Sequence, residues 1–166
     1  MVLQRDANVT VWGWAGEGEK VTINFNGKTY NAVAGADGKW EAILSQLKAG
    51  GPYSMDINAS NHLTLKDILI GDVWVCSGQS NMVLPMDRVK YRYKEVIANS
   101  DNPSIRHFIV PDKYDFNAPQ EDLPSGRWES VNPETVLKFT AVGYFFAKEL
   151  FEKYRVPIGL INASLG

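Results

Sequence analysis

The 166-residue sequence has very little cysteine and histidine, and it has no long apolar run. The single cysteine, Cys76, excludes an internal disulfide framework and a multi-cysteine metal site. The two histidines, His62 and His107, leave little room for a histidine-rich metal centre, so we expect no metal and no cofactor. Because no long apolar run is present, the sequence also predicts no transmembrane helix and no membrane partner.

The sequence shows no strong excess of charge of either sign. Lysine plus arginine total 17 and aspartate plus glutamate total 19, which gives a formal net charge of −2. The basic residues are scattered rather than clustered, which argues against a nucleic acid as partner. The first residues lack the charged start and apolar core of a signal peptide. The last residues follow directly on a buried-looking strand, and we therefore expect the chain to be a fragment.

Residues 1–66 show the alternation of polar and apolar side chains that is typical of half-buried strands. Asn26-Gly27 lies between two such runs and is a strong hairpin signal, because both residues tolerate positive φ. Gly50-Gly51-Pro52 is expected to break the chain. The pattern predicts a small all-β domain, sandwich-like or jelly-roll-like, with strands over 9–14, 21–26, 28–33, 39–44, 53–57 and from Leu63 onward.

Three tryptophans fall on these strands: Trp12, Trp14 and Trp40. Exposed tryptophans can form a platform that stacks against sugar rings. In a small β-domain, however, tryptophans more often fill the core. The sequence leaves both interpretations open.

Residues 67–166 change to longer apolar runs and helical spacing. Val73–Cys76 does not alternate, which is typical of a parallel strand that is buried on both faces. The order of elements is β-α-β-α-β, the first part of a parallel-sheet α/β domain. The expected elements are a helix over 87–99, a strand over 104–110, a long loop over 111–126, a helix over 140–154 and a strand over 158–162. The helix is expected to bury Val142, Phe145, Phe146 and Leu150.

Polar residues follow the strand that ends at Cys76, at the end of a parallel sheet where ligands usually bind. A serine on this glycine-containing turn, within Ser77–Met82, is well placed to act as a nucleophile. The alternative is a polar turn in which Ser80 or Asn81 caps the following helix. Cys76 itself is expected to be a buried thiol. His107 is expected to be a hydrogen-bonded histidine in the core or on a strand face, and His62 is expected to be exposed.

Several segments resemble the sialate O-acetylesterase family, part of the SGNH-hydrolase superfamily of serine esterases. The strongest is Gly71-Asp72-Val73-Trp74-Val75-Cys76-Ser77-Gly78-Gln79-Ser80-Asn81-Met82, which resembles the first signature block of the family. Phe139–Leu150 resembles a family helix, with Thr140 where serine is usual. Val156–Gly166 resembles the strand that leads into a Gly-Gly-Thr/Ser block. The resemblance covers nearly the whole chain.

The resemblance implies that Ser80 is the nucleophile that attacks acetyl esters on sugars. It implies an oxyanion hole that includes the backbone N–H groups of Ser80 and Gly166. Gln79 and Asn81 match motif positions and are expected to brace the turn or line the pocket. The Asp-x-x-His that supplies base and orienting acid in the family does not occur here. The isolated chain is therefore expected to be inactive or nearly so, and the family suggests a secreted or periplasmic location.

A fragment of such a domain must leave apolar surface uncovered. We expect this surface at Phe145, Phe146, Leu160 or Ile161, with the missing C-terminal half or a second chain covering it. The rival hypothesis is a non-catalytic carbohydrate-binding or interaction module whose turn only looks catalytic. Such a module should fold and bind sugar without any further polypeptide.

Overall fold

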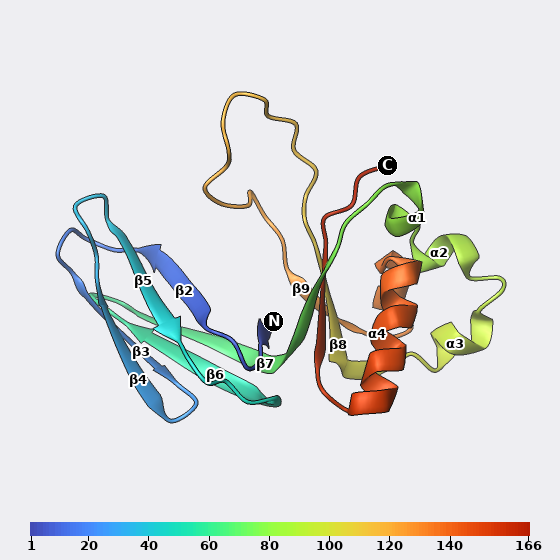
Figure 1. Ribbon diagram of the computed structural model, residues 1–166, viewed down its shortest axis with the longest axis horizontal. Coiled ribbons are helices and arrows are strands. Elements are labelled where there is room, and N and C mark those ends of the chain that lie inside the picture. Colours follow the sequence, from blue (N-terminus) through green and yellow to red (C-terminus); the bar gives the residue numbers. More distant parts are fainter. The chain divides into compact units, whose positions relative to one another are not determined.

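The computed structural model describes residues 1–166, which divide into two compact units (Figure 1). Leu3–Gly71 form one unit, and Met1–Val2 together with Asp72–Gly166 form the other. The domain boundary that the sequence predicts between residues 66 and 67 falls inside strand β7 (His62–Cys76), which contributes residues to both units. The short strand β1 (Val2–Gln4) pairs with β7.

The unit formed by residues 3–71 contains only strands. β2 (Val9–Trp14) pairs with β5 (Lys39–Leu44). β3 (Lys20–Phe25) lies between β4 (Lys28–Val33) and β6 (Gly50–Asn58), and β6 in turn pairs with β7. All of these pairs are antiparallel. Alternate residues of β3 are buried, as the period of two predicted. Asn26 and Gly27 both have positive φ, as the hairpin between β3 and β4 requires.

The break expected at Gly50-Gly51-Pro52 does not interrupt its strand. Gly50-Gly51-Pro52 lies within β6, where the register with β7 shifts between Gly50 and Tyr53. Both glycines have positive φ, so an irregular stretch is accommodated without ending the strand. Gly71-Asp72 likewise lies inside β7, which runs through it as one strand.

The unit that contains residues 72–166 holds a parallel sheet. β10 (Ile158–Asn162) lies between the end of β7 and β8 (Asn102–Ile109), parallel to both. β9 (Trp128–Val131) adds an antiparallel edge strand to β8, which the sequence did not predict. Helix α4 (Ala141–Tyr154) runs alongside these strands (Figure 1). Residues 111–126 form no helix or strand, as predicted.

The single helix expected over residues 87–99 is wrong. The segment instead forms α2 (Met86–Val89) and α3 (Lys94–Ala98), and a further short helix, α1 (Ser80–Val83), precedes them. The helical path breaks at Tyr93, whose backbone is not helical. A 3-10 helix over Thr135–Lys138, which the sequence did not predict, leads into α4.

The buried face of α4 also differs from the predicted one. Its buried residues are Ala141, Gly143, Tyr144 and Ala147, whereas Val142 and Phe146 are exposed. The reason is close packing: a Cβ at Gly143 would lie 3.1 Å from the Cys76 sulfur and 3.4 Å from the Leu160 side chain. Small residues and the ring of Tyr144 therefore face the sheet, and Phe145 and Leu150 pack against the cluster only partly buried.

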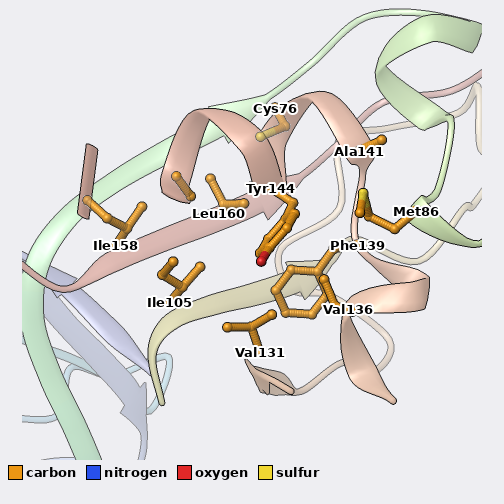
Figure 2. Packing of buried hydrophobic residues seen from close by; sticks show 11 residues of the cluster. Cys76, Met86, Ile105, Val131, Val136, Phe139, Ala141, Tyr144, Ile158 and Leu160 are labelled. Carbon is orange, nitrogen blue, oxygen red and sulfur yellow. The ribbon is translucent and has the colours of Figure 1, made fainter. Parts of the chain in front are cut away.

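One apolar cluster fills the space between α4 and the parallel sheet. In Figure 2 the ring of Tyr144 extends into its centre, between Leu160 and Phe139. The labelled members of the cluster are Cys76, Met86, Ile105, Val131, Val136, Phe139, Ala141, Tyr144, Ile158 and Leu160. This cluster holds α4 against the strands, and it thereby fixes the end of β7 that leads to Ser80.

The prediction that Val73–Cys76 is buried on both faces is wrong at two positions. Trp74 is 44% exposed and Val75 is 66% exposed, although β10 pairs with this part of β7. The Trp74 ring meets the ring of Phe146, itself 40% exposed, edge to face at 5.0 Å.

We call Trp74, Val142 and Phe146 the Trp74 surface. Of the four residues expected to mark an uncovered face, Leu160 is fully buried and Phe146 is exposed. Phe145 and Ile161 are partly buried. The uncovered surface therefore lies beside the predicted position, over β7 and the flank of α4.

Candidate functional site

The residues that follow β7 form a tight turn into α1. Gly78 has φ of +146°, a conformation that side-chain-bearing residues rarely adopt. The backbone N–H groups of Met82 and Val83 donate to the carbonyl of Gln79 and start the helix. Ser80 is the first helical residue and is exposed, which agrees with its predicted place just beyond the carboxyl end of a strand.

The chain that follows β10 runs directly beside this turn. The N–H of Ala163 donates to the carbonyl of Cys76 at 2.9 Å, and the N–H of Leu165 donates to the carbonyl of Gly78 at 3.1 Å. Figure 1 shows the C-terminal segment ending next to α1. The ends of two neighbouring parallel strands therefore bring Ser80 and Gly166 together.

Gly166 packs against the backbone of the serine turn. A Cβ at position 166 would overlap the Ser80 amide nitrogen and lie 2.9 Å from the carbonyl carbon of Gln79. No larger residue fits without a backbone shift. The sequence resemblance placed Ser80 and Gly166 in one oxyanion hole, and the structure places the two residues in contact; their catalytic role stays a prediction.

Asn162, the last residue of β10, shapes the chain that carries Gly166. Its side-chain oxygen accepts hydrogen bonds from the N–H and the hydroxyl of Ser164. Its backbone carbonyl accepts from the N–H of Val110 on the neighbouring β8 side. Asn162 is almost fully buried, so these bonds are shielded from water. Asn162 thus directs the chain toward Ser80, a role that the sequence did not reveal.

Thr140 holds α1 in place from the other side. Its hydroxyl caps α4 by accepting from the N–H of Gly143 at 3.5 Å, and it also contacts the sulfur of Met82 in α1 at 3.7 Å. The N–H of Ala141 donates to the carbonyl of Leu84 at 2.8 Å. Thr140 is fully buried. The available signal for its importance was its place in the family helix, where serine is usual.

A small cavity adjoins the segment that carries Gly166. It has a volume of about 170 Å³ and lies between Ala163–Leu165 and the start of the long loop, Val110–Tyr114. Tyr114 and Phe116 of this loop are largely exposed. Long loops in compact domains are often functional, and this one borders the chain beside Ser80.

No side chain hydrogen-bonds to the Ser80 hydroxyl. His62 is exposed and contacts Asp56 at 3.2 Å, whereas His107 is buried among core side chains, as predicted for both. Cys76 is buried, as predicted, and burial raises the pKa of its thiol. Gln79 and Asn81 are exposed on either side of Ser80. In this structure, therefore, none of these side chains is hydrogen-bonded to the Ser80 hydroxyl as a base.

Neither a metal site nor a membrane segment emerges from the side chains. No group of three or more His, Cys, Asp or Glu residues could hold a metal ion. None of the helices has both the length and the apolar character needed to cross a bilayer.

Comparison with known proteins finds similarity to sialate O-acetylesterases. The chain is 30% identical to human sialate O-acetylesterase over 189 residues and 28% identical to the rat protein over 184 residues. The match covers the whole of this chain but only 34–35% of those relatives, so the chain spans about a third of their length. No family model matches.

A solved structure adds a likeness in three dimensions. The crystal structure of a carbohydrate acetylesterase from Xanthomonas citri superimposes with a TM-score of 0.94 and is 38% identical in sequence. The superposition covers 99% of this chain and 38% of that protein.

Proposed function

We propose that the chain belongs to the sialate O-acetylesterase family, whose members it resembles over about a third of their length, and that it forms the nucleophile-bearing part of a serine esterase. The substrate class is a carbohydrate that carries O-acetyl groups. The fold of residues 72–166 is then the first portion of an SGNH-hydrolase domain. The same kinship is the reason for proposing a secreted or periplasmic location.

The contact between Gly166 and the Ser80 backbone carries this proposal. A carbonyl oxygen bound there would accept hydrogen bonds from the N–H groups of Ser80 and Gly166 as negative charge develops. The Ser80 oxygen attacks the acetyl carbon, and a base takes the hydroxyl proton. The sugar hydroxyl then leaves with that proton, and water releases acetate from the acetyl-serine.

The residues on either side of Ser80 would bind the substrate rather than take part in the reaction. Gln79 and Asn81 flank Ser80 on the exposed turn and are placed to line the pocket. The cavity between Val110–Tyr114 and Ala163–Leu165 offers space beside the reacting centre. Its volume of about 170 Å³ suits a group of a few atoms, such as an acetyl, better than a whole sugar ring.

The base and its orienting acid must come from further polypeptide. No side chain of this chain hydrogen-bonds to the Ser80 hydroxyl, and the relatives are about three times as long as the matched region. The exposed Trp74 surface lies on the same unit as Ser80. We therefore include in the proposal that further polypeptide covers the Trp74 surface and delivers the base.

Active-site labelling tests the nucleophile in a polypeptide that extends this sequence to the length of its relatives. A fluorophosphonate probe should modify one serine, and mass spectrometry of the digested protein should place the label on Ser80. Ser80→Ala should abolish labelling and the hydrolysis of acetylated sugars. Ser77→Ala is the matched control, because Ser77 lies on the same exposed turn, and it should still be labelled.

The same experiment can overturn the proposal. Labelling at a serine other than Ser80, or full esterase activity in the Ser80→Ala variant, would remove Ser80 from the mechanism. Equal loss of labelling in Ser77→Ala and Ser80→Ala would indicate damage to the turn. Circular dichroism of both variants then identifies which of them is folded.

A further inference from the structure

The all-strand unit has an open cleft of its own, far in sequence from Ser80. It has a volume of about 430 Å³, and all of its lining residues lie between Val11 and Leu65. Trp12 and Trp14 line it, together with Leu63 from β7. The three side chains are 50%, 53% and 51% exposed. Large exposed apolar side chains that border a concave surface commonly mark a binding site.

The two tryptophans form an ordered pair. Their ring centroids are 5.3 Å apart and the ring planes are nearly perpendicular, at 88°. Trp40 anchors the strand beneath them, because its buried indole packs on Gly13, where a Cβ would lie only 2.8 Å from the ring. Gly13 therefore lets the third tryptophan fill the core while its neighbours Trp12 and Trp14 stay exposed. Of the two interpretations that the sequence left open, a place in the core therefore applies to Trp40, and an exposed platform remains open for Trp12 and Trp14.

A carboxylate organises the polar rim of the cleft. Glu19 accepts hydrogen bonds from the N–H of Gly16 at 2.7 Å and from the N–H of Ser60 at 2.5 Å. These bonds tie together the loops before β3 and after β6. The Ser60 side chain, followed by the N–H groups of Ser60 and Gly16, lowers the pKa of Glu19. Ser60 and Asn61 also line the cleft. The rim therefore offers hydroxyl, amide and carboxylate groups next to exposed indole rings.

The charge of the cleft restricts its ligand. Glu19 is the only charged residue among those that line it; next to the tryptophans, Lys39 lies opposite Trp14 and Glu41 opposite Trp12, and these two charges are of opposite sign. The Glu19 carboxylate, held by two hydrogen bonds, disfavours a second negative charge nearby. A ligand with a carboxylate of its own would meet repulsion, whereas a neutral ligand would not.

We propose that this cleft binds a neutral oligosaccharide, separately from the Ser80 site. A pyranose ring has an apolar C–H face that stacks on an indole, and its hydroxyl groups would reach the rim formed by Glu19, Ser60 and Asn61. The perpendicular rings of Trp12 and Trp14 would contact a face and an edge of the sugar. The esterase and the sugar-binding unit can thus share one polysaccharide, and attachment through this unit raises the local concentration of acetyl groups.

Isothermal titration calorimetry of the 166-residue chain tests the binding without requiring catalysis. The probes are xylohexaose and N-acetylchitohexaose, which are neutral, and sialyllactose, which is anionic. At least one neutral probe should bind with a dissociation constant of about 1 mM or tighter. Trp12→Ala and Trp14→Ala should each weaken that binding at least about tenfold. Trp74→Ala is the matched control, because it removes an exposed indole from the other unit, and it should change binding less than about twofold.

Each alternative outcome has a definite meaning. The proposal is overturned if no neutral probe binds, if the Trp12 and Trp14 variants bind as tightly as the parent, or if sialyllactose binds more tightly than both neutral probes. Sedimentation velocity tests the other occupant, a second copy of the chain: a dimer that dissociates on Trp12→Ala would also overturn it. Should an alanine variant fail to fold, Trp12→Tyr keeps an aromatic ring and should retain most of the affinity. Because binding does not involve Ser80, its loss would leave the proposed esterase function intact.

Discussion

His107 makes the stability of the chain depend on pH in a predictable direction. It lies on β8, is only 2% exposed, and packs its ring 4.4 Å from that of Phe139. Its Nε2 is buried without a hydrogen-bond partner. Glu129 lies directly opposite His107 in the β8–β9 pair, and its carboxylate forms an ion pair with Arg127. The imidazole is therefore held neutral in an apolar setting.

The size of the effect follows from the pKa. Burial lowers the pKa of His107 from 6.5 to about 4, against a smaller opposing effect of the Glu129 carboxylate. Below pH 6.5 His107 binds a proton in the unfolded chain but stays neutral in the folded chain, so the free energy of unfolding falls as the pH decreases toward 4. At pH 5 the loss is (6.5 − 5) × 1.36, or about 2 kcal/mol.

Urea unfolding at pH 7.5 and pH 5 measures this loss. His107→Leu removes the titrating group and keeps the site apolar, so the parent should lose about 2 kcal/mol more than the variant over this interval. His62→Gln is the control for the loss of an exposed histidine; it leaves His107 in place, so most of the pH dependence of the parent should remain. Carboxylates that titrate near pH 5 contribute equally to the parent and to His107→Leu and cancel in that comparison, whereas His62→Gln also removes a contact that lowers the pKa of Asp56.

Two results would refute the reasoning. One is an identical loss of stability in the parent and in His107→Leu. The other is an imidazole signal of His107 in the nuclear magnetic resonance spectrum that titrates near pH 6.5 in the folded chain. Either would show that water or a partner group reaches the ring.

Three further predictions concern the serine turn. Thr140→Ala should lower the free energy of unfolding by about 1 kcal/mol by removing the cap of α4, whereas Thr140→Ser should retain most of it, as measured by urea unfolding. Gly166→Ala should shift the amide resonances of Gln79 and Ser80, because its Cβ would overlap the turn; unchanged resonances would contradict the contact. The 166-residue chain by itself should hydrolyse 4-nitrophenyl acetate no faster than its Ser80→Ala variant, since members of a catalytic triad act together; clear turnover that depends on Ser80 would bring His62 or His107 back into consideration.

Local sequence patterns were sufficient for most strands and for the place of Ser80. The strands β2 to β5 depend on alternation and on turns such as Asn26-Gly27, which act over a few residues. α4 begins after Thr140, within one residue of its predicted start, because its cap is also a local feature. The serine turn is recognisable because Gly78 and the residues around Ser80 are contiguous in the chain.

Tertiary packing decided what the local pattern could not. The helix expected over residues 87–99 divides in two, and α4 faces the sheet with Gly143 and Ala147, because the fit between helix and sheet outweighs hydrophobic periodicity. Exposure also depends on neighbours that are distant in sequence. Trp74 is exposed although β10 pairs beside it, whereas Trp40 is buried because Gly13 of another strand makes room for it. The contact between Gly166 and Ser80 joins residues 86 positions apart, which only the pairing of β7 with β10 brings together.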